Sequence, residues 1–247
     1  MIPRLYIDCP IDKNQPVLLD EGQRRYLIRT LRLGIGAAVK LFSSAGEEGE
    51  WRGNLIQTDS PALVQVTDFT PFRKESPLQI TLIQGLAKGN ATELVIQKAV
   101  ELGATRLIPL VSRRSVRRPP SDRKDNKVSR WQSIILEAAQ QCGRVRLMQI
   151  HPPMNWNELD AHLPEGPRYL FWEEQGGEGL TLRNLPHPGS AVTLLVGPEG
   201  GLSAEEVELA QARWGFVVVG LGPRVLRTET AGLAVLSGCQ VLWGDLG

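Results

Sequence analysis

LLVGPEGG, residues 194–201, is an apolar run that breaks into a loop with three glycines, one proline and one carboxylate, Glu199. Ser203 and Glu206 follow with the spacing of a capping box, which predicts that a helix begins after Ser203. A buried strand that leads directly into a helix is the building unit of a parallel α/β sheet. Glycines let the backbone approach a ligand closely, and Glu199 would repel a phosphate there. The stretch therefore predicts a ligand loop for something other than a nucleotide phosphate.

The same alternation of strands and helices extends over the C-terminal part of the chain. We expect strands at residues 78–86, 106–111, 168–172, 191–197 and 216–220, and helices at 90–103, 127–142, 203–214 and 228–243. Asn90 and Glu93 have the spacing of another capping box. A second glycine loop, LGPRVLRTET at 221–230, also follows a strand and precedes a helix. Ligands of open parallel sheets bind beyond the carboxyl ends of the strands, so the two loops could form one pocket.

The N-terminal part has a different pattern. Strand-like runs at 37–43, 50–57 and 62–69 are separated by turn residues, and a helix is expected from Asp20 to Gly34. These features predict a small barrel-like domain over residues 1–73, joined through a linker at 70–77 to an α/β domain over residues 74–247. The first ten residues do not have the pattern of a signal peptide, and no run is long and apolar enough for a membrane span.

The composition narrows the function classes. Of 247 residues, 42% are hydrophobic and 22% are charged, as in globular proteins. The three cysteines and three histidines have no disulfide or metal-ligand spacing, so we expect a reduced, cytoplasmic protein without metal or membrane anchor. The net charge of +1 hides a segregation, because residues 77–151 carry +8 and residues 152–247 carry −7. Such segregation predicts a polyanionic partner on one part of the molecule.

The basic segment SRRSVRRPPSDRKDNKVSR, residues 112–130, is the centre of that positive charge. Its two prolines favour a loop, and its density of arginine favours RNA phosphate over a merely solvated surface. In the helix that follows, Glu137, Gln141 and Arg144 form one polar stripe, which could equally be an ordinary solvated face. The last helix, 230–243, is apolar on nearly all sides, and this favours a subunit interface.

Taken together, the motifs resemble those of the RsmE family of SPOUT-superfamily RNA methyltransferases over essentially the whole chain. The resemblance rests on LRL near residue 32, KGNATELVIQKAVELG (88–103), RW with EAAQQCGR (130–144), LLVGPEGGLSAEE (194–206), LGPRVLRTETA (221–231) and the final GDLG. It departs from the common family pattern at Gln140, where glutamate is frequent, and at Arg25 and Tyr26, where a histidine is common.

The resemblance implies a C-terminal α/β trefoil knot, a rare exception to the unknotted folds of proteins, and an N-terminal PUA-like RNA-binding barrel. It implies a homodimer that uses S-adenosyl-L-methionine to methylate N3 of uridine 1498 in the 16S rRNA of the small ribosomal subunit. The implied cofactor-binding residues are Val196, Gly197, Pro198, Glu199, Gly200, Leu221, Gly222, Val225, Leu226 and Thr230. For RNA contacts we expect Lys88, Arg113, Arg114, Arg117, Arg118, Glu137, Gln141 and Arg144.

For the catalytic residues we expect an arginine that stabilises the anion developing on the uracil, first Arg227 and then Arg224. Glu199 or Glu137 could accept the N3 proton, and transfer without a protein base also stays open. Three alternative functions compete with this one: an RNA-binding scaffold without activity, a nucleotide-phosphate enzyme on a doubly wound sheet, and a SPOUT enzyme that modifies tRNA or another base. A cofactor-binding assay separates the first two from a methyltransferase.

Overall fold

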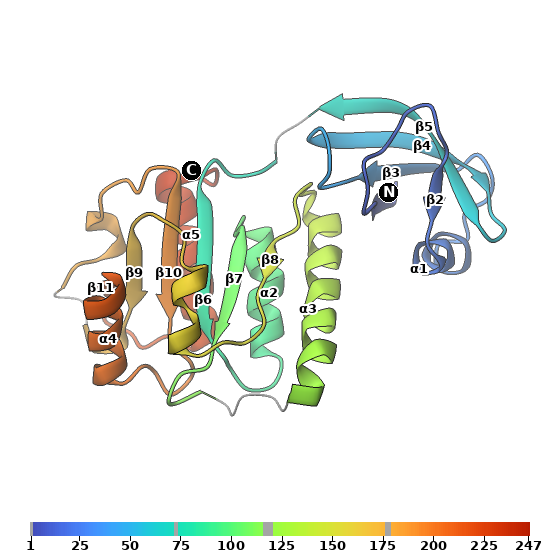
Figure 1. The fold of residues 1–247 in the computed structure, drawn as a ribbon. Coiled ribbons are helices and arrows are strands. Elements are labelled where there is room, and N and C mark those ends of the chain that lie inside the picture. The colour runs from blue at the N-terminus through green and yellow to red at the C-terminus, as the bar shows by residue number, and fades with distance from the viewer. Residues whose placement is uncertain (1, 72–73, 116–120, 176–178) are drawn as a thin grey trace. The chain divides into compact units, whose positions relative to one another are not determined.

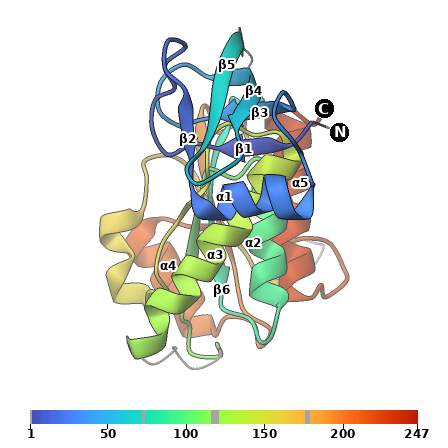
Figure 2. The same ribbon diagram turned by 90° about the vertical axis from the view of Figure 1, so that its right-hand side faces the viewer.

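A computed structural model gives the fold of the chain and describes residues 2–71, 74–115, 121–175 and 179–247 (Figures 1 and 2). The contacts within the chain divide it into two compact units. The first contains Met1–Glu75 together with Ala139–Leu147, and the second contains Ser76–Ala138 and Met148–Gly247. The sequence placed the boundary near residue 73 and gave no sign that a segment around residue 140 belongs to the first unit.

The first unit is built on one mixed five-stranded sheet in the order β1-β3-β4-β5-β2. Only β1 and β3 are parallel, and the other neighbours are antiparallel. Alternate residues of a strand point to opposite faces, so Ala62, Val64 and Val66 are buried while their neighbours are not. The strands are β1 (Arg4–Tyr6), β2 (Val17–Leu19), β3 (Ala38–Phe42), β4 (Gly49–Gln57) and β5 (Ala62–Pro71).

The helix of the first unit begins as predicted and ends earlier. The Asp20 side chain caps α1 (Glu21–Arg25) by accepting a hydrogen bond from the Gln23 backbone, and the Gln23 side chain accepts one from the Asp20 backbone. A π-helix, Tyr26–Thr30, continues it. The backbone leaves the helix at Arg32, whose φ of 55° is left-handed, so the helix does not reach Gly34 as expected.

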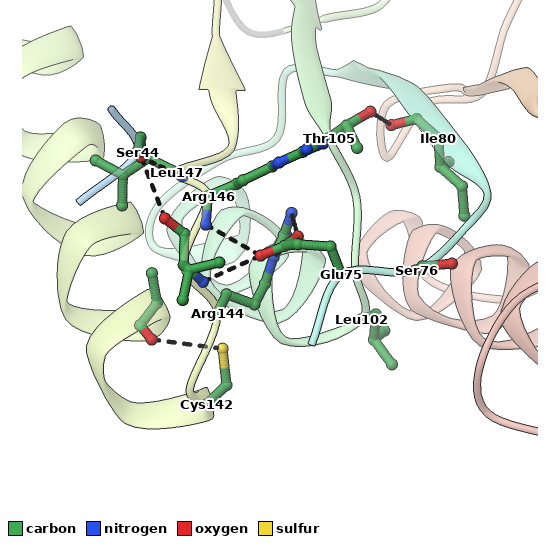
Figure 3. Close-up of polar contacts among 12 residues, drawn as sticks. Ser44, Glu75, Ser76, Ile80, Leu102, Thr105, Cys142, Arg144, Arg146 and Leu147 are labelled. Atoms are coloured by element: carbon green, nitrogen blue, oxygen red, sulfur yellow. Dashed lines mark hydrogen bonds and ion pairs between the residues drawn. The ribbon is translucent and has the colours of Figure 1, made fainter. Parts of the chain in front are cut away.

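Residues 139–147 join the first unit through a dense set of polar contacts (Figure 3). Glu75 accepts hydrogen bonds from Arg144 Nε at 2.9 Å, Val145 N at 3.1 Å and Arg146 N at 3.0 Å. Arg4 donates to the carbonyl oxygens of Ala139 and Arg144 at 2.8 and 2.7 Å. Arg144 is only 4% exposed. We therefore correct its assignment as an RNA contact, since a guanidinium buried in an ion pair is not presented to phosphate.

The second unit contains a six-stranded sheet in which all neighbouring strands are parallel, in the order β11-β9-β10-β6-β7-β8. This confirms the α/β class and the parallel sheet predicted from the sequence. The knotted path of the chain stays a prediction. The strands are β6 (Gln79–Gly85), β7 (Arg106–Leu110), β8 (Gln149–Ile150), β9 (Arg168–Phe171), β10 (Ala191–Val196) and β11 (Val217–Val219).

Helices cover both faces of this sheet, which explains why its strands are continuously apolar (Figure 2). Figure 2 shows α2 and α5 on one side and α4 on the other. Ile83, Leu195 and Ala210 belong to the core on the α4 side. The α-helices that begin in this unit are α2 (Ala91–Glu101), α3 (Ser121–Cys142), α4 (Ala204–Trp214) and α5 (Thr228–Trp243). The last residues of α3, from Ala139 on, belong to the first unit. Short 3-10 helices span Trp156–Glu158, Asp160–His162, Glu173–Gln175 and Leu182–Asn184.

Two helix starts differ from expectation. Asn90 precedes α2 without a side-chain capping bond, and its backbone is helical, with φ of −89° and ψ of 0°, rather than extended as in a capping residue. Glu93 pairs with Arg130 of α3 instead of folding back on Asn90. α3 begins at Ser121 rather than 127, so part of the basic segment that we expected to be a loop is helical. The capping box at Ser203 and Glu206 is confirmed.

Candidate active site

One cavity of about 580 Å³ lies in the second unit, where both glycine loops meet. The ends of β9 and β10, the loop after β11 and the first residues of α5 form its wall. It therefore lies beyond the carboxyl ends of parallel strands, as expected for a ligand site of such a sheet. The lining residues are Lys88, Ala91, Phe171, Trp172, Glu173, Val196, Gly197, Pro198, Glu199, Gly201, Leu221, Gly222, Arg224, Val225, Leu226, Arg227, Thr228, Glu229 and Ala231.

Most residues that the sequence assigned to the cofactor and to catalysis face this cavity. The expected catalytic residues Glu199, Arg224 and Arg227 line it, as do Val196, Gly197, Pro198, Leu221, Gly222, Val225 and Leu226. Gly200 and Thr230 are outside the lining. Gly200 instead lies against Arg114, where a Cβ on Gly200 would be 3.0 Å from the Arg114 Cβ.

Several lining residues escaped the sequence reasoning. Phe171, Trp172 and Glu173 reach the cavity because β9 is the neighbour of β10 in the sheet. The order of strands in a sheet depends on the whole topology, so no local sequence pattern predicts that these three residues line the cavity. Thr228 was overlooked in the loop, and Lys88, which we assigned to RNA, also lines the cavity.

Because glycine has no side chain, the first glycine loop can lie very close to its neighbours. A Cβ on Gly85, at the end of β6, would be 2.3 Å from the Pro198 backbone nitrogen. Gly201 has a φ of 69°, and a Cβ there would collide with the Glu173 carboxylate. Glu199 Oε1 accepts a hydrogen bond from the Lys88 backbone nitrogen at 2.8 Å. The loop is therefore held at defined points and shapes the cavity by its backbone.

The start of the basic segment is anchored beside this loop by a buried carboxylate. Glu206, which is 7% exposed, accepts hydrogen bonds from the Arg113 backbone and the Trp156 indole, both at 2.8 Å, and from the Ser203 backbone at 3.0 Å. Glu206 thus caps α4 and also holds the segment after β7. A carboxylate that accepts several N–H donors fixes the segments that carry them.

The other expected RNA contacts have varied surroundings. The exposed Arg113 side chain lies 3.4 Å from Glu205, and Arg114 Nη1 donates to the Gly200 carbonyl at 3.0 Å. Arg117 and Arg118 lie outside the described residues. Glu137 and Gln141 are exposed on α3, and Glu137 does not line the cavity.

Glu93 and Arg130 join α2 to α3 by a bidentate ion pair, with Arg130 Nε and Nη2 at 2.5 and 2.7 Å from the two carboxylate oxygens. The hydrogen bond from Arg130 holds the pKa of Glu93 below its usual value. The Arg130 side chain is still 66% exposed. The pair therefore links α2 to α3 at an exposed point of the surface.

The cavity wall carries charges of both signs. Its cations are Lys88, Arg224 and Arg227, and its carboxylates are Glu173, Glu199 and Glu229. In the part of the chain that the structure describes, no three His, Cys, Asp or Glu residues gather into a possible metal site. No helix among those residues is long and apolar enough to cross a membrane.

Comparison with known proteins agrees with this architecture. Residues 74–240 match the model of a family described as RNA methyltransferase domain. Ribosomal RNA small subunit methyltransferase E of Bacillus subtilis is 32% identical over 89% of this chain and 89% of its own length.

Two solved structures match the whole fold. Ribosomal RNA small subunit methyltransferase E of Neisseria gonorrhoeae, bound to S-adenosyl methionine, is 31% identical with a TM-score of 0.90, and each chain is covered completely. A protein of Legionella pneumophila with the bound cofactor SAM is also 31% identical with a TM-score of 0.91 and complete coverage of both chains. Given these matches and the cavity between its two glycine loops, the chain belongs to the ribosomal RNA small subunit methyltransferase E (RsmE) family of RNA methyltransferases.

Proposed function

We propose that this protein uses S-adenosylmethionine to methylate N3 of uridine 1498 in the 16S rRNA of the small ribosomal subunit. The observation that carries the proposal is the cavity of about 580 Å³ between the two glycine loops, in a chain of the RsmE family. The choice of N3 and of this uridine rests on the family resemblance of the motifs.

The residues of the cavity fit S-adenosylmethionine. The volume lies within the usual range for small-molecule sites, roughly 300–1,000 Å³. Val196, Leu221 and Leu226 offer apolar surface for an adenine ring. Carboxylates suit the sulfonium and ammonium groups of the ligand. The glycine loop 197–201 has no lysine for a phosphate chain.

When bound, S-adenosylmethionine supplies a methyl group on a positively charged sulfur, and the protein has to position the uracil for it. Uridine N3 carries a proton that must leave, so negative charge develops on the neighbouring carbonyl oxygens. Arg227, just before α5 in the cavity wall, is our first candidate to stabilise that charge, and Arg224 is the second. Fixed cations at the site of developing charge lower the barrier most effectively.

Glu199 is our candidate for accepting the N3 proton. Its Oε1 is held by the Lys88 backbone, and the carboxylate lines the cavity. Glu137, the other candidate from the sequence, lies exposed on α3 and outside the cavity lining. Of these two carboxylates, the position in the cavity lining therefore favours Glu199 as the proton acceptor.

For RNA binding we propose two contributions. The N-terminal unit serves as a PUA-like RNA-binding domain, and the basic segment with Arg113 and Arg114 binds phosphates. Neutralising Arg113, Arg114, Arg117 and Arg118 together should flatten the salt dependence of RNA affinity, by roughly 0.7 in slope for each phosphate that these arginines neutralise. An unchanged slope would place the RNA-binding surface elsewhere.

We also propose that the active form is a homodimer in the cytoplasm. α5 exposes Val241 and Leu242 by 56% and 44%, Leu246 follows with 52%, and α2 exposes Leu94 by 41%. Exposed apolar side chains on adjacent helices suit a subunit interface. Sedimentation of the wild type should give a dimer, and Val241→Glu with Leu242→Glu should give monomers. A wild type that sediments as a monomer would remove this part of the proposal.

The cofactor assignment is tested by calorimetric titration with S-adenosylmethionine and, separately, with ATP. We expect the protein to bind S-adenosylmethionine and not to bind ATP. Binding of ATP alone would return the glycine loop to the phosphate-binding class. A protein that binds RNA but binds neither S-adenosylmethionine nor ATP would favour an RNA-binding scaffold without activity.

A further inference from the structure

The two glycine loops are joined by one buried hydroxyl group. Thr228 opens α5 directly after the second loop and is 5% exposed. Its Oγ1 donates a hydrogen bond to the carbonyl oxygen of Gly197 in the first loop. Both residues line the cavity, so this bond sets how the two loops meet at the ligand site.

Behind Thr228 lies Gln84, near the end of β6 and 2% exposed. Gln84 Nε2 donates to Thr228 Oγ1 at 2.7 Å. A hydroxyl that accepts from one neighbour must turn its own hydrogen toward another acceptor. The Gln84 amide therefore directs the Thr228 hydrogen toward Gly197, and the three residues form a chain with one direction.

The peptide bond at the end of this chain has one polar group only. Pro198 follows Gly197, so the peptide carries no N–H and its carbonyl is the sole polar group. Held by Thr228, this carbonyl is satisfied within the protein. Without the donor it would be a buried acceptor without a partner, or would turn toward the ligand.

The Gln84 side chain does not give this position its highest stability. Its Oε1 is buried without a hydrogen-bond partner among the described residues. It faces α5, where a Cβ on Gly232 would be only 2.6 Å away. An unsatisfied buried oxygen lowers stability, and an apolar side chain of similar length would avoid it. A role in the site accounts for a glutamine at this position.

We propose that Gln84, which is outside the cavity lining, is a positioning residue for the ligand site. It acts through Thr228 on the Gly197 carbonyl and so fixes the glycine loop in its ligand-binding shape. The inference rests on the proposed function, and it predicts that removing the Gln84 amide weakens binding of the cofactor more than it slows the chemical step.

The test uses Gln84→Leu, Thr228→Val and their combination, with the dissociation constant of S-adenosylhomocysteine measured by calorimetry. Each single variant should weaken binding about tenfold, the effect of removing one hydrogen bond at a buried group. The combination should bind like Thr228→Val alone, because Gln84 acts only through the hydroxyl. Independent effects would multiply to about a hundredfold loss and would overturn the chain. Thr228→Ser keeps the hydroxyl group and should bind S-adenosylhomocysteine as tightly as the wild type does.

A matched control is Gln240→Leu, since Gln240 is also buried in this unit and its Nε2 donates to the Leu102 carbonyl at 2.9 Å. Gln240→Leu should lower the melting temperature and leave the dissociation constant unchanged. With saturating RNA, Gln84→Leu should raise KM for S-adenosylmethionine and leave kcat within about twofold.

Wild-type binding by Gln84→Leu would refute the positioning role. If that variant does not fold, the contrast between Thr228→Val and Thr228→Ser decides the same point, and equal binding by these two refutes it. A wild type that binds no S-adenosylhomocysteine would instead refute the proposed function.

Discussion

Arg114 donates a hydrogen bond from Nη1 to the Gly200 carbonyl oxygen at 3.0 Å, so the basic segment contacts the outer side of the glycine loop. Pro198, Glu199 and Gly201 of the same loop line the cavity. One loop thus lies between a candidate phosphate-binding residue and a candidate cofactor site.

This contact predicts that RNA and cofactor binding are coupled. Arg114→Ala should leave the affinity for S-adenosylhomocysteine within about twofold without RNA, because a single exposed hydrogen bond contributes little. The wild type should bind S-adenosylhomocysteine more tightly when an RNA fragment with the target uridine is present, and the variant should lack most of that gain. Calorimetry with and without RNA measures it, and equal gains in both proteins would exclude coupling through this contact.

Arg227→Ala tests the role of the arginine in the cavity wall. Removal of a positioned cation typically lowers kcat by about 10²–10³. Affinity for S-adenosylmethionine should stay nearly intact. Arg213→Ala is a suitable control, because Arg213 pairs with Asp160 and is not in the cavity lining. If Arg227→Ala instead weakens binding of S-adenosylmethionine and leaves kcat at saturating cofactor unchanged, Arg227 holds the cofactor.

The three cysteines should react with thiol reagents at very different rates. Burial raises the pKa of the Cys239 thiol to about 12, whereas Cys9 is exposed. At pH 8 Cys239 would be thiolate in about one molecule in 10⁴, so it should not react while the protein is folded. Ellman's reagent should show one fast thiol, and Cys9→Ser should remove it. A fast reaction at Cys239 would contradict its burial.

Arg32 should be replaceable with a gain in stability. Its left-handed φ of 55° strains any side chain, and glycine is the residue that adopts this conformation freely at a helix end. Arg32→Gly should therefore raise the free energy of unfolding by about 1 kcal/mol. Arg29→Gly, inside the π-helix, should lower it by a similar amount, about 1 kcal/mol. Urea titrations of both variants compare the signs, and a loss of stability in Arg32→Gly would argue against strain at this residue.

The sequence predicted those parts of the fold that depend on local patterns. The strands expected at 78–86, 106–111, 168–172, 191–197 and 216–220 are all present, as β6, β7, β9, β10 and β11. The expected helix starts at Asp20 and Ser203 are also real. β1, β2 and β8 are only two or three residues long, too short for a periodic signal. At Asn90 the backbone is helical rather than extended, so the predicted capping box does not form, and Glu93 pairs with Arg130.

The site residues that lie in the glycine loops could be predicted from the sequence. Those that reach the site through the order of the strands in the sheet could not. Leu221 and Gly222 lie in a recognisable loop, whereas Phe171 reaches the cavity only because β9 pairs with β10. Arg144 looked like a surface residue in a polar stripe, and its burial against Glu75 depends on a contact across 69 residues of sequence. Gln84 gave no signal, since its role depends on Thr228 far along the chain.

The most direct test of the central claim is to incubate the protein with S-adenosylmethionine and small ribosomal subunits whose uridine 1498 is unmethylated, and then to map the rRNA. A methyl group on N3 blocks base pairing, so reverse transcription should stop one nucleotide before uridine 1498, and mass spectrometry of that fragment should show one added methyl group. The Arg227→Ala variant should give a much weaker stop. A methyl group on another nucleotide, or unmodified rRNA from a protein that binds S-adenosylmethionine, would contradict the proposed reaction.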